Sequence, residues 1–169
     1  MFMTPKPLTL RKSLWRTLSA DTLLLAGVCL LPWIHVAAPW LVQFNPMLLL
    51  LLAGMIVVDS HRNAFLLAVL LPIVPMLIVG VPTPWRALCM MAELVTVVAV
   101  FPWLSRQVHT PNRWLSQTVA MVAAMLLGKG IYYALKSLVV GATAVVGTPW
   151  TLQLVVVLIS AGLFAALKR

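Results

Sequence analysis

The stretch LLPIVPMLIVGVPTPWRALCMMAEL, residues 70 to 94, decides the fold because it holds two apolar runs joined by a short break. The break is Gly80 to Pro84, and the second run contains Glu93, the only acidic residue between Asp59 and the C-terminus. An ionised carboxylate at the centre of a membrane costs about 2.5–3.5 kcal/mol on insertion scales. If both runs lie in a membrane, Glu93 therefore needs a partner elsewhere in the chain or in a ligand.

The composition of the whole chain indicates a membrane protein with several spans. Of its 169 residues, 63% are hydrophobic and 9% are charged, whereas about a quarter of the residues in a soluble domain are charged. The formal net charge is +9, but the cations do not form a basic groove with stacking aromatic residues, so no nucleic-acid partner is expected. In membrane proteins an excess of Lys and Arg usually marks cytoplasmic loops.

No motif for catalysis or for metal binding is recognisable in the sequence. The two cysteines, Cys29 and Cys89, lie in apolar runs and lack the spacing of a metal or redox site. No Ser/His/Asp set, phosphate-binding loop or pair of carboxylates occurs either. We therefore expect no enzymatic activity, no cofactor and no metal, and a packing role for both cysteines.

The N-terminal region resembles a signal peptide only in its charge. Four cations precede the first apolar run: Lys6, Arg11, Lys12 and Arg16. A proline, a tryptophan and a histidine follow where a small-residue cleavage site would stand, so a retained first helix is expected. We interpret residues 1–20 as a basic cytoplasmic arm, part of which lies on the bilayer surface, and residues 21–169 as one transmembrane domain.

Breaks between the apolar runs predict an all-α bundle of six transmembrane helices. Pro32 and Pro39 predict a kink or an early end in the first span, and the second is short enough to need tilt or local thinning of the bilayer. The predicted spans cover residues 22–41, 45–58, 64–80, 85–104, 115–140 and 150–167.

The distribution of cations gives this bundle an orientation. Six spans place both termini on one side, together with the second and fourth loops, and these segments hold nine of the twelve Lys and Arg residues. The first and fifth loops hold none, and the third has only Arg86 at its border. The positive-inside rule therefore predicts a protein of the inner (cytoplasmic) membrane with both termini in the cytoplasm.

In this topology Glu93 and Lys129 lie at similar depths. Glu93 is about eight residues below the outer surface, or on the order of 12 Å, and Lys129 about eleven residues, or ~16 Å, at ~1.5 Å per residue. The depths predict an ion pair between the two, or a pocket in which both face a polar ligand. Both interpretations remove the unpaired charge, and the sequence leaves them open.

Further candidate binding residues lie in the same outer half. Tyr132, Tyr133 and Lys136 follow Lys129 on the fifth span, although Lys136 also fits a side chain that extends to the outer interface. Trp85 and Arg86 begin the fourth span, where both suit an interfacial anchor. Alternatively, Trp85 stacks on a ligand ring. His35, near the outer end of the first span, either contacts the ligand or lies at the interface.

Two stretches resemble the S components of energy-coupling factor (ECF) transporters, the small six-helix proteins that capture vitamins. The first is LPIVPMLIVGVPTPWRALCMMAELV, residues 71–95, with a Leu-Pro stretch, a Gly-x-Pro hinge and a Glu-Leu pair as in that family. The second is AMLLGKGIYYAL, residues 124–135, which is similar to the family's Gly-(Arg/Lys)-x-x-Tyr pattern. The resemblance extends loosely over residues 20–167.

The resemblance implies a function in nutrient uptake. The chain would bind a small polar nutrient from outside, in a cavity built by the last three helices and the outer loops, and would dock in the membrane on a T component driven by two ATPase subunits. In the family, an Ala-x-x-x-Ala surface on the first helix serves this docking. Here the corresponding row holds Ser19, Leu23 and Gly27.

A second interpretation belongs to another class of protein. The rod-shape protein MreD is a membrane scaffold of similar length and basic charge that transports no substrate. On that interpretation Glu93 and Lys129 are structural, and the cytoplasmic cations face a protein partner. An extended apolar groove favours the scaffold, whereas a closed outer pocket with an acid and lysines favours capture of a carboxylate-bearing metabolite.

Overall fold

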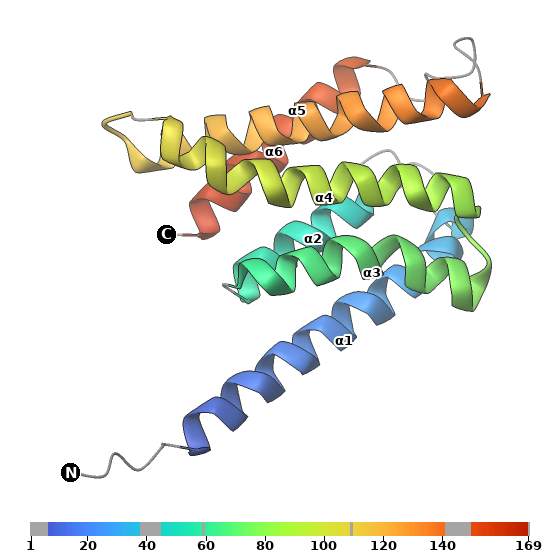
Figure 1. The fold of residues 1–169 in the computed structure, drawn as a ribbon, viewed down its shortest axis with the longest axis horizontal. Coiled ribbons are helices and arrows are strands. Elements are labelled where there is room, and N and C mark those ends of the chain that lie inside the picture. Colours follow the sequence, from blue (N-terminus) through green and yellow to red (C-terminus); the bar gives the residue numbers. More distant parts are fainter. Residues whose placement is uncertain (1–6, 38–44, 59, 109, 141–149, 169) are drawn as a thin grey trace.

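A computed structural model describes residues 7–37, 45–58, 60–108, 110–140 and 150–168. Within these ranges the fold is all-helical, as predicted, and no strand occurs (Figure 1). The described ranges form six helices: α1 (Pro7–Ala37), α2 (Pro46–Val57), α3 (His61–Val79), α4 (Pro84–Gln107), α5 (Arg113–Val140) and α6 (Trp150–Leu167).

Four of these helices are long and apolar enough to cross a membrane. They are α3, α4, most of α5, and the segment Thr17–Ile34 of α1. Helices α2 and α6 are apolar but shorter. The prediction of a membrane-embedded helical protein therefore agrees with the fold, while the count of six spans stays a prediction.

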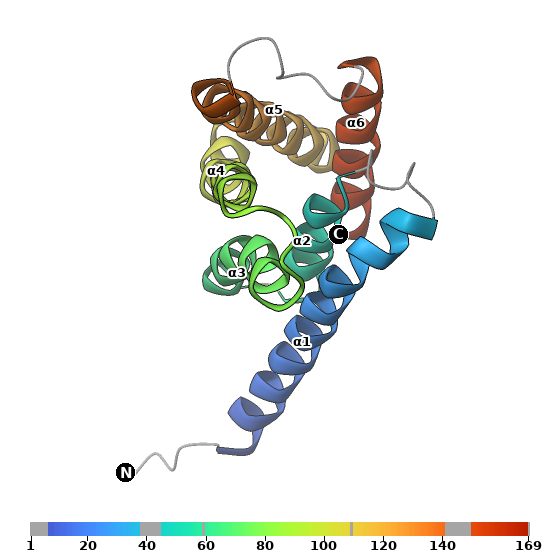
Figure 2. The same cartoon turned by 90° about the vertical axis from the view of Figure 1, so that its right-hand side faces the viewer.

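Helix α1 joins the predicted N-terminal arm to the predicted first span. It runs from Pro7 to Ala37 with Pro32 in its interior, so residues 7–20 continue the same helix. Its last turns bend away from the long N-terminal part (Figure 2). A proline inside a helix removes one backbone hydrogen bond and clashes with the preceding turn, which explains a bend in this region.

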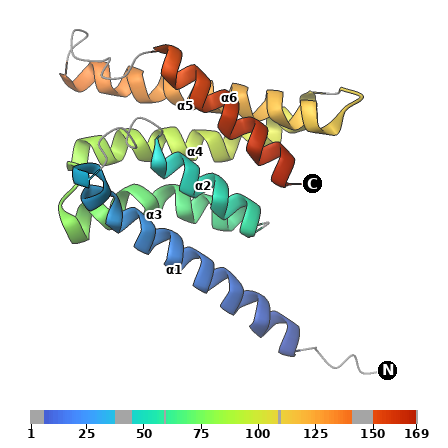
Figure 3. The ribbon, with the colours of Figure 1, turned by 180° about the vertical axis from the view of Figure 1, so that it is seen from behind.

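Helix α2 lies at the centre of the apolar core. It packs against α1, α3 and α6, and Figure 3 shows α2 and α6 on one side of the bundle with α1 crossing beneath. Half of its twelve residues are buried: Met47, Leu48, Leu51, Leu52, Gly54 and Met55. Gly54 allows close packing here, because a Cβ atom would come 2.5 Å from the Leu67 side chain of α3, which would have to shift.

The predicted hinge between α3 and α4 is a tight turn. Gly80 ends α3 with φ +77°, a left-handed conformation that glycine adopts without strain. Its N–H donates to the carbonyl of Met76 at 3.1 Å. Pro84 then occupies the first turn of α4, where a missing N–H costs no helical hydrogen bond.

The antiparallel arrangement sorts the helix termini into two ends of the bundle. Helices α3 and α5 end where α2, α4 and α6 begin, on the right-hand side of Figure 1. The other end gathers the starts of α1, α3 and α5 with the last turns of α2, α4 and α6. Helix α1 thus begins at the end where α6 finishes, as an even number of crossings requires.

Candidate functional site

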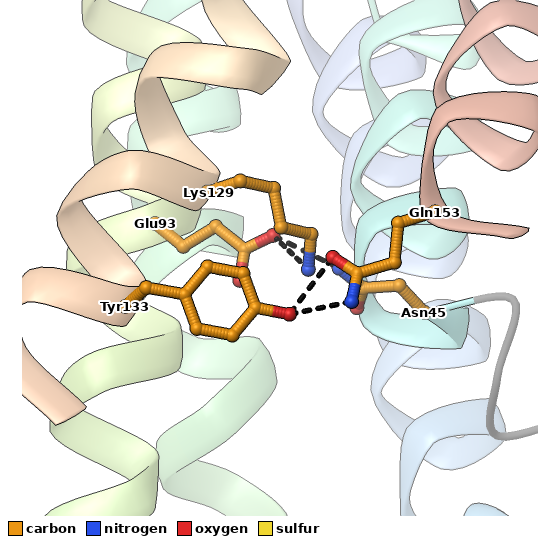
Figure 4. Close-up of polar contacts among 5 residues, drawn as sticks. All are labelled: Asn45, Glu93, Lys129, Tyr133 and Gln153. Atoms are coloured by element: carbon orange, nitrogen blue, oxygen red, sulfur yellow. Dashed lines mark hydrogen bonds and ion pairs between the residues drawn. The ribbon is translucent and has the colours of Figure 1, made fainter. Parts of the chain in front are cut away.

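Glu93 and Lys129 form an ion pair inside the bundle. The Lys129 Nζ atom lies 2.8 Å from Glu93 Oε1, and the two side chains are 17% and 4% exposed (Figure 4). Glu93 is on α4 and Lys129 on α5, which are the two most extensively packed neighbours among the described helices. The ion pair predicted from the equal depths of the two residues is therefore confirmed.

Asn45 supplies a second partner for the carboxylate. Its Nδ2 atom donates to Glu93 Oε1 at 2.9 Å. Asn45 precedes α2 and has φ 49°, a left-handed conformation that asparagine tolerates better than most residues. The hydrogen bond joins residues that are 48 positions apart in the sequence. The Glu93 carboxylate therefore connects α4 to α5 and to the residue that precedes α2.

Gly128 permits the close approach of α5 to α4 beside this ion pair. A Cβ atom at Gly128 would lie 2.9 Å from the Glu93 carbonyl oxygen and 3.1 Å from a methyl group of Val97. At Gly130, two residues on, an added Cβ atom would meet nothing within 4 Å. Of the two glycines that flank Lys129, only Gly128 is therefore needed for packing.

The ion pair faces a cavity of about 480 Å³, which we call the Glu93 pocket. This volume falls in the range of about 300–1,000 Å³ that is typical of small-molecule sites. All six helices or the residues next to them contribute to its wall. The wall contains eight polar or charged side chains: Asn45, Arg86, Glu93, Lys129, Tyr132, Tyr133, Lys136 and Gln153.

Two tyrosines on α5 form one side of the Glu93 pocket. The rings of Tyr132 and Tyr133 meet edge to face with centroids 5.3 Å apart. The ammonium group of Lys129 lies 5.4 Å from the centre of the Tyr132 ring. The Tyr133 hydroxyl donates to Gln153 Oε1 of α6 at 2.8 Å (Figure 4). The tyrosines thus present aromatic surface beside the ion pair and connect α5 to α6.

Cations outnumber acids in the wall of the pocket. Arg86, Lys129 and Lys136 are cationic, and Glu93 is the single acid among the described lining residues. Because Glu93 and Lys129 neutralise each other, Arg86 and Lys136 leave the wall with two formal positive charges. The segments 38–44 and 141–149, outside the described residues, contain no acidic residue in the sequence.

The structure brings together five of the seven residues predicted to bind the ligand. Glu93, Lys129, Tyr132, Tyr133 and Lys136 all line the Glu93 pocket. Trp85 is 51% exposed and is not among the lining residues. His35 lies in α1, but its side chain is outside the described residues, as is that of Trp150. Substrate binding by these residues stays a prediction.

Sequence analysis missed three polar residues of the pocket. Asn45 was interpreted only as the start of a span, Arg86 as an interfacial anchor, and Gln153 was not considered. Each lies within a few residues of a helix start on the same end of the bundle as Glu93. Arg86 and Gln153 lie near the outer ends of their predicted spans, and this shared depth is the signal in the sequence that identifies them.

Metal ligands do not gather in the part of the chain that the structure describes. No group of three or more His, Cys, Asp or Glu side chains there is placed to hold a metal ion. Cys89 is buried and Cys29 partly buried, and neither forms a disulfide bond. The chemistry available in the Glu93 pocket is therefore charge pairing, hydrogen bonding and aromatic contact.

Comparison of the chain with protein-family models, with characterised proteins and with solved structures finds no match.

Proposed function

We propose that this chain is a membrane-embedded binding subunit that captures a small anionic nutrient in the Glu93 pocket. The nutrient carries a carboxylate and a planar ring, and the chain acts as an S-component-like subunit of an ECF-type uptake transporter with six spans. The observation that carries the proposal is one cavity that combines a buried ion pair, two further cations and two tyrosines.

The free-energy cost of burying the ion pair favours a ligand site over a pair that only holds α4 and α5 together. Burying two charges is expensive, and apolar residues of similar volume often hold helices together equally well. Both residues line the cavity, and the Lys129 side chain is 17% exposed. Polar residues inside membrane proteins usually face a bundle interior or a water-filled cavity and mark substrate pathways.

The charge of the wall supports an anion as the ligand. After the ion pair is neutralised, Arg86 and Lys136 supply two positive charges from α4 and α5. Arg86 and Tyr132 line the same wall and interact through charge. A planar guanidinium group binds a carboxylate with two parallel hydrogen bonds. The adjacent tyrosine rings suit an aromatic or heterocyclic body.

The location of the pocket agrees with capture from outside the cell. It is formed around the α3–α4 hinge, residues preceding α2, and the adjoining halves of α4, α5 and α6. In the predicted topology this end faces outward, because most cations belong to the other end. Release into the cell would then require a T component and two ATPase subunits, to which the chain docks within the membrane.

A scaffold like MreD is the second candidate, and helix α1 favours it. The N-terminal part of α1 diverges from the bundle (Figure 1), and several large apolar side chains of α1 are exposed. They include Leu18, Leu23, Leu30 and Trp33. Lipid covers such a surface in a transporter subunit, whereas in a scaffold a partner helix covers it.

Capture of metabolites distinguishes the two candidates. The purified protein in lipid nanodiscs is incubated with a polar extract of cells, re-isolated and analysed by mass spectrometry for enriched small molecules. Arg86→Gln/Lys136→Met serves as the comparison, because it removes the positive charges of Arg86 and Lys136 and keeps the Glu93–Lys129 ion pair. We expect one anionic compound to be enriched by the wild type and lost from the variant. If the wild type and the variant enrich the same compounds to the same extent, the proposal is wrong.

Identification of the protein partners is the second part of this test. The tagged protein is isolated with its native membrane neighbours and these are identified by mass spectrometry. Recovery of a transmembrane subunit with two ATPases supports uptake, whereas recovery of cell-wall or cytoskeletal proteins supports the scaffold.

A further inference from the structure

The opposite end of the bundle contains a second cavity, which we call the Arg106 pocket. Its volume is about 610 Å³, and its wall comes from the last turns of α2 and α4, the first turns of α3 and α5, and the end of α6. No residue lines both this cavity and the Glu93 pocket. Its polar lining residues are Ser60, His61, Ser105, Arg106, Gln117 and Lys168.

The charge of the Arg106 pocket is positive. Arg106 and Lys168 line it, and none of the described lining residues is acidic. Asp59, which adjoins two lining residues in sequence, is outside the described residues. The loops and the C-terminal segment at this end carry Arg62, Arg106, Arg113, Lys168 and Arg169 in the sequence. Asp21 of α1 is the other acid near this end and accepts a hydrogen bond from Asn63 at 2.9 Å, so five cations exceed two acidic side chains.

Aromatic residues position Lys168 at the mouth of the cavity. Its Nζ atom lies 5.4 Å from the ring centre of Phe164 and 5.9 Å from that of Phe101. The two rings meet edge to face, 5.3 Å apart. An ammonium group over an aromatic face is held by the ring quadrupole. These contacts therefore hold the ammonium group of Lys168 beside the pocket.

The other lining residues are apolar or aromatic. They are Met55, Val58, Ala64, Ala99, Phe101, Pro102 and Trp103. Trp103 is 60% exposed, and tryptophan is enriched at the boundary between a membrane and water. A cavity lined by two cations together with seven apolar or aromatic side chains matches an amphiphile with an anionic head.

We propose that the Arg106 pocket binds a phosphate group, held by Arg106 and Lys168. Two sources carry this group at the predicted cytoplasmic face: the headgroup of an anionic phospholipid and a soluble phosphate. Basic pockets between transmembrane helices on the cytoplasmic side bind anionic lipid headgroups, and an arginine guanidinium matches the geometry of phosphate oxygens. This site is independent of the Glu93 pocket and of the nutrient-binding function.

The lipid arm of the test uses native mass spectrometry. The protein is placed in micelles with equal amounts of phosphatidylglycerol and phosphatidylcholine, and retained lipid is counted. We expect preferential retention of one phosphatidylglycerol. Removing one cation should weaken retention about fivefold, and the double variant Arg106→Gln/Lys168→Met about 25-fold, given roughly 1 kcal/mol per cation near an anionic headgroup. Arg106→Lys keeps the charge and should retain most of the lipid.

Arg113→Gln is the matched control. Arg113 lies in the same loop region, is exposed and does not line the Arg106 pocket. It should retain phosphatidylglycerol as the wild type does. An equal loss of bound phosphatidylglycerol in Arg113→Gln and Arg106→Gln would mean that retention depends on the total charge of the surface. This outcome would contradict a specific phosphate site at Arg106 and Lys168.

The soluble arm measures thermal stability in phosphatidylcholine micelles with added inorganic phosphate. A stabilisation that disappears in Arg106→Gln/Lys168→Met, without preference for phosphatidylglycerol, supports a soluble phosphate as the source. If the double variant retains lipid like the wild type and phosphate stabilises neither protein, the proposal is wrong. Arg106→Lys and Arg106→Gln/Lys168→Met change only residues at helix ends near the surface, so we expect both proteins to keep the fold.

Discussion

Glu93 and Lys129 form an ion pair in the interior of the bundle, whereas Arg106 and Lys168 line the cavity at the other end and share one sign. Glu93 is 3% exposed and contacts both Lys129 and Asn45. Arg106, in contrast, is exposed on the last turn of α4. A buried charge must be compensated within the fold, while an exposed charge is compensated by water. Changes to the Glu93–Lys129 pair should therefore affect the stability of the fold, whereas changes to Arg106 should not.

The largest expected effect is that of Lys129→Met. It leaves the Glu93 carboxylate buried with Asn45 as its remaining partner, and breaking a buried pair from one side costs about 3–5 kcal/mol. The measurement is the free energy of unfolding in mixed micelles, obtained by titration with a denaturing detergent. The double variant Glu93→Gln/Lys129→Met removes both charges and should recover most of the loss. A loss below about 1 kcal/mol in the single variant would contradict a buried, interdependent pair.

Asn45→Gly tests the second partner of the carboxylate. Glycine keeps the left-handed backbone of residue 45 available and removes only the side chain. Loss of a hydrogen bond to a charged group should lower the free energy of unfolding by about 1.5–3 kcal/mol. In a Glu93→Gln background the same change should cost clearly less. Equal costs in the two backgrounds would show that Asn45 does not act through Glu93.

Gly128→Ala tests the close contact of α4 and α5. The added methyl group would meet the Glu93 carbonyl oxygen at 2.9 Å, so the helices must separate, at a cost of about 1–3 kcal/mol. Gly130→Ala is the matched control, because its methyl group meets nothing within 4 Å and alanine favours helix. Thermal unfolding of the two variants in the same detergent makes the comparison. Similar stabilities would mean that α4 and α5 are less tightly packed than described.

Arg106→Gln should have the smallest effect on stability. The side chain is exposed, and surface substitutions usually change the free energy of unfolding by less than about 0.5 kcal/mol. The measurement is the same detergent titration, without added anionic lipid. A loss as large as that of Asn45→Gly would break the contrast between the two ends of the bundle.

The helices could be predicted from the sequence because their limits are set by local chemistry. Pro46 and Pro84 occupy first turns and Gly80 ends α3, and each position is typical of its residue type. The predicted spans consequently agree with the observed helices to within a few residues, apart from the N-terminal extension of α1. The pairing of Glu93 with Lys129 was also accessible, because depth along a helix follows from counting residues.

The remaining parts of the site depend on contacts between distant segments. The hydrogen bond from Asn45 spans 48 positions and accompanies a positive φ angle, neither of which leaves a pattern in the neighbouring sequence. Arg86 and Trp85 are neighbours at the start of α4 and both looked like interfacial anchors. Only the orientation of the helix separates them, since Arg86 lines the pocket and Trp85 does not.

The most direct test of the central proposal is native mass spectrometry of the protein released from its own membranes. The account predicts a wild-type spectrum with one bound small molecule of a few hundred daltons, and its loss in Arg86→Gln/Lys136→Met. Because that variant keeps Glu93, Lys129 and Asn45, its fold should persist, and unchanged thermal stability verifies this. Identical spectra for the folded wild type and the folded variant would contradict the proposal that the Glu93 pocket captures an anionic nutrient.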